Sequence, residues 1–409
     1  MPASDSPAPL IKLPGLLATY AVGFFSLSLV PMTSLIVPLW ALKIGASPGM
    51  IGLVVASRAV LPFLLSIHGG AMMDRLGLRR MLLLFSAVGA GLSFLYPLSV
   101  SVWMLILLQL IVGWTQGMGW MGAQIKIAKL TAGHATYAGR FSAVTTVGTA
   151  AGPLLAGIAW DTWGAWGAFG VIGLWGTCLL IAAYALPSPK ESAVVPLDWR
   201  ELVPKPSDYL RAFALMSIPA VALVVAATFL RIGVMSVQNS FYTVYLHDIG
   251  LSGTLMGILV GSQSLIGGPA SLLTGTAARF MRPHWVLLGS TAMAIVAITI
   301  TPLFTTFMPL MIAACFFGIG IGVGFPLLLT MLAGGSQASE QGLSVGLRTT
   351  ANRLASIVIP VVMGLVIEVT GIAYGFLVIG LMLMGVLAAV GWAVHRSPAF
   401  ARGNDEFNS

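Results

Sequence analysis

Apolar runs long enough to cross a membrane recur through the whole chain, and they constrain its fold more than any other feature. A hydrocarbon core about 30 Å thick takes roughly twenty apolar residues of helix. Only 8% of the residues are charged, against about 25% in soluble domains, so the sequence predicts an all-α protein embedded in a lipid bilayer. Twelve spans are predicted: 16–42, 48–72, 80–99, 101–125, 139–162, 165–187, 214–246, 252–274, 285–305, 308–333, 346–368 and 374–394.

The positions of the cations indicate how these spans are oriented. If the N-terminus lies in the cytoplasm and twelve spans alternate, sixteen of the twenty Lys and Arg residues fall on the cytoplasmic side. Lys43 then faces outward, and Arg58, Arg231 and Arg353 lie within spans. The positive-inside rule therefore predicts a multi-pass protein of the cell's inner (cytoplasmic) membrane with both termini cytoplasmic. Since this topology accounts for the net charge of +8, we expect no nucleic-acid partner.

The two halves of the chain repeat each other. The stretch 188–213, rich in Pro and charge, predicts a cytoplasmic linker between an N-terminal six-helix bundle (1–187) and a C-terminal six-helix bundle with a cytoplasmic tail (214–409). Parallel six-span repeats are the architecture of one large class of secondary transporters, with the substrate site at the repeat interface. At an offset of 205, Ile44, Gly45, Ser47, Gly52 and Gly70 match Ile249, Gly250, Ser252, Gly257 and Gly275; at 207, Pro153, Gly157, Asp161, Gly164, Phe169 and Gly173 match Pro360, Gly364, Glu368, Gly371, Phe376 and Gly380.

The loop between spans two and three reads Gly70-x-x-x-Asp74-Arg75-x-Gly77-x-Arg79-Arg80. Its spacing and position resemble the loop signature of the major facilitator superfamily. The resemblance implies twelve transmembrane helices in two pseudo-symmetric six-helix bundles, which open to one side of the membrane at a time. It also implies a gating latch formed by Gly70, Asp74, Arg75, Gly77 and Arg79, in which Asp74 caps span eleven near Gly346. The alternative is that these charges only set topology.

Span five carries a second pattern, Gly148-x-x-x-Gly152-Pro153-x-x-Ala156-Gly157. It resembles the motif of the drug and organic-solute antiporter branch, with Ala156 where a second glycine is usual. Small residues four apart let helix backbones approach closely, and proline bends a helix, so we expect Gly148, Gly152, Pro153 and Gly157 to pack and rock during gating.

Span eight offers a matching face in Gly253, Gly257 and Gly261, although ordinary helix packing would explain the span-five pattern too. Span four departs from the antiporter pattern. Gly113 stands three residues before the pair Gln116-Gly117, where such antiporters usually carry arginine. This departure puts the usual proton coupling in doubt.

Two arginines lie deep inside predicted spans, and every carboxylate can be placed at a membrane edge or beyond. An intramembrane cation costs at least about 2.5 kcal/mol unless it faces the protein interior or water. We therefore expect Arg58 and Arg231 to face a central cavity, where an anionic or strongly hydrogen-bonding solute would satisfy them. Carbonyls, waters or nearby amides are the structural alternative. Arg353 lies about two turns into span eleven from the cytoplasm and could snorkel there, so it ranks lower as a candidate. The other candidate substrate-binding residues are Gln116, Gln238, Asn239, Gln263, Trp120 and Tyr242.

The glycine run Gly318-x-Gly320-x-Gly322-x-Gly324 before Pro326 in span ten is unsuited to a stiff helix. We interpret it as a gating segment, with tight packing against span eleven as the alternative.

These features favour a secondary active transporter of a small organic solute, most simply an exporter or antiporter of amphipathic compounds that uses a coupling proton or a counter-substrate. The first alternative is an organic-anion exchanger or facilitator that uses Arg58 and Arg231, and the second is a non-transporting membrane receptor. The sequence contains no H-E-x-x-H, paired mid-span carboxylates or phosphate-binding glycine loop, so we expect neither an enzyme nor a metal or cofactor. We expect a monomer.

Overall fold

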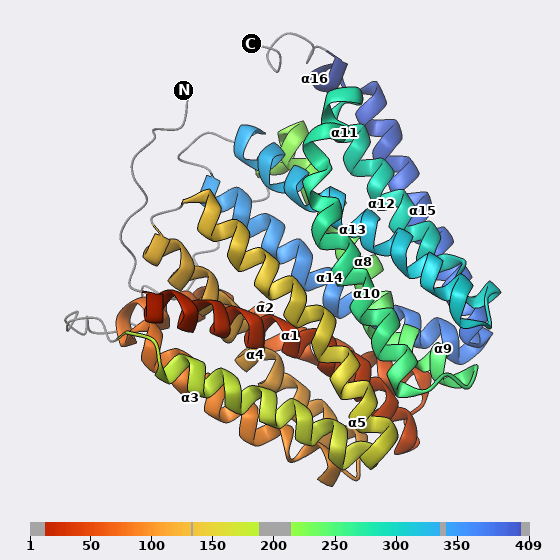
Figure 1. Cartoon of the computed structure of the whole chain (residues 1–409). Coiled ribbons are helices and arrows are strands. Elements are labelled where there is room, and N and C mark those ends of the chain that lie inside the picture. Colours follow the sequence, from red (N-terminus) through yellow and green to blue (C-terminus); the bar gives the residue numbers. More distant parts are fainter. Residues whose placement is uncertain (1–12, 132–133, 188–213, 336–340, 402–409) are drawn as a thin grey trace.

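A computed structural model describes residues 13–131, 134–187, 214–335 and 341–401. The side chains of 66–71, 74, 75, 135, 333–335, 341–343, 399 and 401 fall outside this description. The described chain is helical, as predicted (Figure 1). Its long elements are α1 Leu13–Lys43, α2 Pro48–Leu76, α3 Leu78–Ser93, α4 Val102–Thr131, α5 Ala135–Tyr184, α8 Pro219–Val237, α10 Gly253–Leu272, α12 Pro283–Thr299, α13 Phe307–Gly335, α14 Gln341–Thr370 and α15 Ile372–Arg396.

Shorter elements connect or extend these helices. The π-helical segment η3 Gln238–Tyr242 and then α9 Thr243–Asp248 continue α8, and α11 Thr274–Phe280 follows α10. The remaining elements are η1 Tyr96–Leu98, η2 Leu215–Ser217, η4 Thr301–Leu303 and α16 Pro398–Ala401. The predicted linker 188–213 lies outside the described residues, and its boundaries stay predictions.

The helices account for the twelve predicted spans. Ten stretches of the described chain are long and apolar enough to cross a membrane. One of them, within α5, contains two predicted spans joined at Gly164, where φ is 63° and ψ −151°. Helix α3 supplies the remaining span, although its 16 residues fall short of a full crossing. The twelve spans form two pseudo-symmetric six-helix bundles, as expected.

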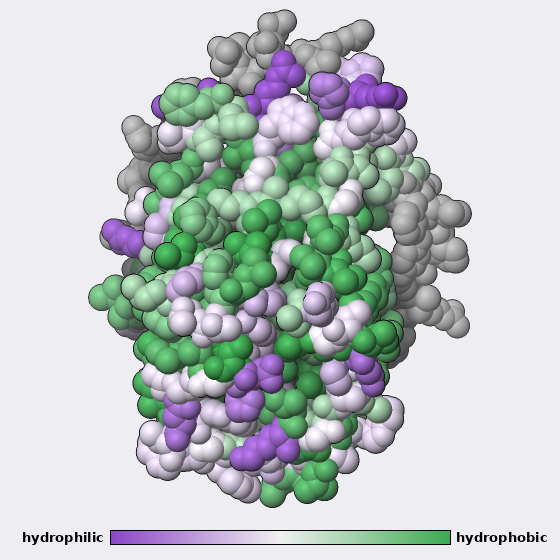
Figure 2. All heavy atoms as spheres, turned by 90° about the vertical axis from the view of Figure 1, so that its right-hand side faces the viewer, coloured by the Kyte–Doolittle hydropathy of each residue, from purple (hydrophilic) through white to green (hydrophobic). Residues whose placement is uncertain are grey.

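An apolar belt covers the face of the C-terminal bundle that Figure 2 shows, between hydrophilic residues gathered toward its two ends. On α15, the side chains of Leu381, Met382 and Trp392 are exposed. An exposed apolar surface of this extent is unfavourable in water and matches the hydrocarbon core of a bilayer.

The internal repeat is visible in the backbone itself. Gly45 and Gly250, which are 205 residues apart, both have φ of 82°. Each precedes a serine that caps the next helix. Ser47 accepts a hydrogen bond from the Met50 N–H at the start of α2, and Ser252 accepts one from the Leu255 N–H at the start of α10. Matching turns and caps at matching positions confirm the register of the repeat.

Two seams of close backbone contact join the bundles, one between α5 and α10 and one between α2 and α14. In the first seam, a Cβ on Gly257 would collide with the Pro153 carbonyl, and one on Gly253 would meet the Gly157 carbonyl. The second seam repeats the first at the expected offsets, with Gly52 against Pro360 and Gly364 against Pro48. The predicted contact between spans five and eight is confirmed.

The glycines of span five pack against two different helices. Gly157 faces α10, whereas Gly148 packs against the Phe24 carbonyl and Gly152 against Met32, both on α1. Half of the span-five pattern thus packs inside the N-terminal bundle.

The glycine run of span ten lies within one continuous helix, α13. Gly318 and Gly322 contact the backbone of α10 at Gln263 and Gly267. Gly320 and Gly324, on the other side of α13, contact α12 at Ser290. The alternative to a gating role was tight packing against span eleven, but these glycines pack against spans eight and nine, because their spacing of four creates two flat faces on one helix. The gating role stays a prediction.

The α13 contacts predict different effects for two glycine-to-alanine substitutions. A Cβ on Gly322 would collide with the Gly267 backbone, so Gly322→Ala should destabilise the protein by about 1–3 kcal/mol. A Cβ on Gly289 in α12 meets no described atom within 4 Å, so Gly289→Ala should be neutral or stabilising by up to about 1 kcal/mol. Thermal melting of the purified proteins checks this, and equal melting of the two variants would contradict it.

Candidate functional site

Arg58 lies between α2 and α1, about midway along both helices. Its Nη1 donates to the Val30 carbonyl at 3.3 Å, to Thr33 Oγ1 at 3.3 Å and to Ser34 Oγ at 3.0 Å. Hydroxyl groups and a backbone carbonyl of α1 thus solvate one edge of the guanidinium group. This agrees with the alternative to substrate binding, in which polar groups of the protein satisfy Arg58. The charge itself is not paired with a carboxylate of the described residues.

The departure from the antiporter pattern at Gly113 has a structural reason. A Cβ on Gly113 would collide with the carbonyl and the side-chain stem of Arg58. The space beside span four that a side chain at 113 would need is therefore occupied by an arginine from span two.

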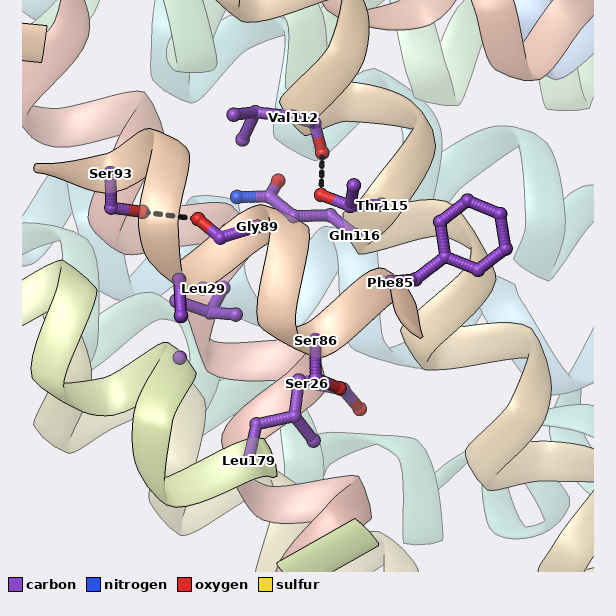
Figure 3. A pocket seen from close by; sticks show the side chains of 12 residues that line it. Ser26, Leu29, Phe85, Ser86, Gly89, Ser93, Val112, Thr115, Gln116 and Leu179 are labelled. Atoms are coloured by element: carbon purple, nitrogen blue, oxygen red, sulfur yellow. Dashed lines mark hydrogen bonds between the residues drawn. The ribbon is translucent and has the colours of Figure 1, made fainter. Parts of the chain in front are cut away.

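Gln116 lies one turn farther along α4, inside the N-terminal bundle. Its Nε2 donates to Thr33 Oγ1 at 3.4 Å, so Thr33 links it to Arg58. Its Oε1 is buried and has no hydrogen-bond partner among the described residues, as is also true of Ser86 Oγ. Both residues line a cavity of about 20 Å³ between α1, α3, α4 and the second half of α5, which Figure 3 shows. That volume holds a water molecule rather than an organic solute.

Arg231 lies near the middle of the C-terminal bundle. Its Nε and Nη2 donate to the Ile321 carbonyl on α13, at 3.4 and 3.3 Å. The guanidinium carbon stands 5.1 Å from the ring centre of Phe325, a cation–π contact. A carbonyl dipole and an aromatic face stabilise this cation, but neither neutralises it.

Helix α14 carries two more arginines, which are half-buried. The Nε atoms of Arg348 and Arg353 are buried and have no hydrogen-bond partner among the described residues. Arg353 lies close enough to Arg58, and Arg348 close enough to Arg231, for their charges to repel. The Nε of Arg353 is buried, and the side chain as a whole is half-buried, so the interpretation that Arg353 snorkels toward the cytoplasm stays a prediction. The sequence analysis counted Arg348, at the start of span eleven, among the cytoplasmic cations and missed it as a candidate site residue.

The described carboxylates lie away from these arginines, at the predicted outer end of the bundles. The Asp161 carboxylate accepts from the Gly253 N–H at 2.7 Å, from the Thr254 N–H at 2.8 Å and from the Thr254 hydroxyl at 2.7 Å. Its repeat partner Glu368 accepts from the Gly49 N–H at 3.2 Å. Each carboxylate therefore caps the N-terminus of a helix in the other bundle, where the helix dipole favours negative charge.

The other predicted substrate-binding residues are dispersed. Gln238 and Tyr242 are buried in η3, which packs against α1 and α2 across the bundle interface, and the Tyr242 hydroxyl has no partner among the described residues. Asn239 between them is half-buried. Gln263 is buried on α10. Trp120 stacks on Phe141 within the N-terminal bundle, with ring centres 6.0 Å apart.

The loop signature is described in part. Gly77 has φ of 91°, which favours glycine, so the turn between α2 and α3 by itself explains this residue. Arg79, expected in water, donates to the Tyr184 carbonyl at the end of α5 and lies 5.3 Å from the Tyr184 ring centre. The side chains of Asp74 and Arg75 lie outside the described residues, as does any side-chain contact near Gly70. The latch stays a prediction.

The family assignment rests on sequence matches that together cover nearly the whole chain. The model of the Major Facilitator Superfamily matches residues 16–227 and again 224–409, which together cover both bundles. The chain belongs to the major facilitator superfamily. It is therefore a multi-pass membrane transporter and not an enzyme. A search of curated proteins finds no match.

Solved structures share this fold at low identity. The nucleoside transporter NupG, in a mutant form, superimposes with a TM-score of 0.76 at 15% identity, over 92% of this chain and 98% of that one. A bacterial homologue of the human lysosomal transporter Spinster, inward-facing and unoccupied, gives 0.71 at 14% identity, over 92% and 94%. The human organic anion transporter MFSD10 gives 0.61 at 18% identity, over 92% and 99%.

The bonds around Arg58 predict that Thr33 supports the N-terminal bundle. Thr33→Val removes an acceptor from a buried cation and should lower the free energy of unfolding by about 1–3 kcal/mol. Thr177→Val is a matched control, because the Thr177 hydroxyl bonds only to the Gly173 carbonyl of its own helix. Thermal melting compares the two, and equal losses of stability would show that the Thr33 contact with Arg58 adds nothing.

Proposed function

We propose that this transporter moves a small organic anion across the cytoplasmic membrane by alternating access. One observation carries the proposal: four half-buried arginines within the bundles have no carboxylate partner among the described residues, namely Arg58, Arg231, Arg348 and Arg353. Carbonyls, hydroxyls and an aromatic ring orient two of these cations, but their charge stays uncompensated. An anionic solute supplies the missing charge, whereas a cationic one would be repelled.

The same charges favour exchange of one anion for another. Proton coupling usually relies on ionisable carboxyl groups inside the membrane. The carboxylates whose side chains are described lie at the predicted outer end, engaged or exposed. Exchange needs no such relay and moves no net charge when the two solutes are alike. It also agrees with the antiporter-like pattern of span five. A human organic anion transporter shares this fold, which supports the proposal of an anionic cargo.

Alternating access and orientation belong to the same proposal. The Lys and Arg distribution favours cytoplasmic termini, which places Asp161 and Glu368 on the outer side. The close seam contacts of Gly52, Gly157 and Gly364 lie toward this side. A Cβ on Gly346, toward the opposite end of α14, would meet no described atom within 4 Å. We infer that the bundles are closed outward, and that opening requires the two carboxylate caps to break.

Exchange by purified protein in vesicles tests the cargo class. Vesicles preloaded with benzoate should take up external radiolabelled benzoate faster than empty vesicles, and benzylamine of similar size should not be taken up. Arg231→Gln should reduce this exchange by about ten- to hundredfold, since it removes a charged partner of the anion. Arg396→Gln, which removes an exposed arginine beside Trp392, is the control. Preferential uptake of benzylamine, or accumulation driven by a pH gradient alone, would refute organic-anion exchange.

The Asp161 cap predicts a change at the first turn of α10. Asp161→Asn removes the negative charge and one of two equivalent acceptor oxygens, so hydrogen exchange at the amides of Gly253 and Thr254 should rise by about tenfold. Asp248→Asn changes an exposed carboxylate on the same side and should leave these amides unaffected. Unchanged protection in Asp161→Asn would show that the cap does not hold the outer end closed.

A further inference from the structure

We propose that Arg58 and Arg353 form a two-guanidinium binding site for the anionic head group of the cargo, placed where the two bundles meet beside the α2–α14 seam. This inference rests on the proposed function and identifies the group that is bound: a carboxylate, phosphate or sulfonate with at least two acceptor oxygens. Because one arginine belongs to each bundle, the bound anion bridges them.

Helix register places the two residues at one level of the membrane. Along the seam, Pro48 lies against Gly364 and Gly52 against Pro360, so α2 and α14 run antiparallel. Arg58 is about 9 Å farther along α2 than Gly52, and Arg353 is about 10 Å back along α14 from Pro360, at 1.5 Å per residue. The two guanidinium charges are correspondingly within range of each other.

The hydrogen bonds of the two residues leave donors available. Arg58 uses only its Nη1 in the bonds to α1, which orient the side chain. Arg353 makes no hydrogen bond among the described residues, although its Nε is buried. A half-buried guanidinium whose buried Nε has no partner is costly, and a second cation nearby raises that cost. An anion between them removes both penalties.

The repeat shows that the seam does not need cations for packing. At the offset of 205, Arg58 corresponds to Gln263 on α10, and at 207, Arg353 corresponds to Thr146 on α5. The α5–α10 seam has the same close glycine contacts, yet it holds two neutral polar residues at the positions where the α2–α14 seam holds two arginines. The positive charge on one side of the pseudo-symmetric molecule is therefore a feature of binding rather than of architecture.

The decisive experiment measures thermal stability with and without anion. The protein is placed in nanodiscs of phosphatidylcholine only, and the probes are phenyl phosphate, benzoate and, as a neutral match, benzyl alcohol. Wild type should melt at a higher temperature with either anion and should not respond to benzyl alcohol. Without anion, Arg353→Gln should melt at or above the wild-type temperature, because it relieves a repulsion and breaks no hydrogen bond.

With anion, Arg353→Gln should bind about ten- to hundredfold more weakly than wild type. Arg353→Lys keeps the charge and loses the planar fork, so it should bind with intermediate affinity. Arg396→Gln should respond as wild type does. A purely structural role for Arg353 predicts the opposite pattern, a lower melting temperature without anion and an unchanged response to it.

The outcomes separate this site from the proposed function. If wild-type vesicles exchange benzoate and Arg353→Gln exchanges it with an unchanged KM, the two-arginine site is wrong and anion transport stands. If wild-type vesicles exchange no anion, the transport proposal itself is wrong.

A parallel set of nanodiscs contains phosphatidylglycerol. Stabilisation by this lipid alone, with no response to phenyl phosphate or benzoate, would overturn the assignment to a transported solute and identify a lipid head group as the ligand.

Discussion

Close contact between helix backbones, made possible by glycine, is the constraint on which this structure depends. In a bilayer, apolar side chains gain little by leaving lipid for a helix interface, so association relies on van der Waals packing of small residues. Two seams use it between the bundles, with Gly257 against Pro153 and Gly52 against Pro360. The same close backbone packing at glycine occurs within the C-terminal bundle, where glycines on two faces of α13 contact α10 and α12. Side chains larger than hydrogen at these positions would separate the helices.

The seams determine how polar groups at the bundle interface are satisfied. Toward the predicted outer end, the helix N-termini of one bundle come within hydrogen-bond distance of carboxylates from the other, as Asp161 and Glu368 show. Deeper in the membrane, the same helices carry arginines for which the described part of the protein provides no carboxylate. Among the described residues, the carboxylates thus lie at the predicted outer end, and the arginines lie deeper without a carboxylate partner. This separation is the basis on which we propose an anionic cargo.

The two halves of the protein pack their helices in the same way but differ in where they carry charged residues. Turns with positive φ, serine caps and seam glycines recur at matching positions, because each bundle packs its helices closely against the other in an equivalent way. The residues that carry charge do not follow this symmetry. Arg58 and Arg353 lie beside one seam, and their equivalents Gln263 and Thr146 beside the other. A single cargo that enters a pseudo-symmetric frame requires such an asymmetry if it is to bind in one orientation.

The sequence by itself determined the spans, the repeat and the contact between spans five and eight, because apolar length and small-residue spacing are local properties of each helix. It also singled out Arg58 and Arg231 from their depth alone. Only the tertiary structure decided that Gly113 makes room for Arg58, that the span-ten glycines face α10 and α12, and that Arg353 lies level with Arg58. These facts depend on which helices are neighbours and how they are rotated, and such contacts join residues that are far apart in the chain.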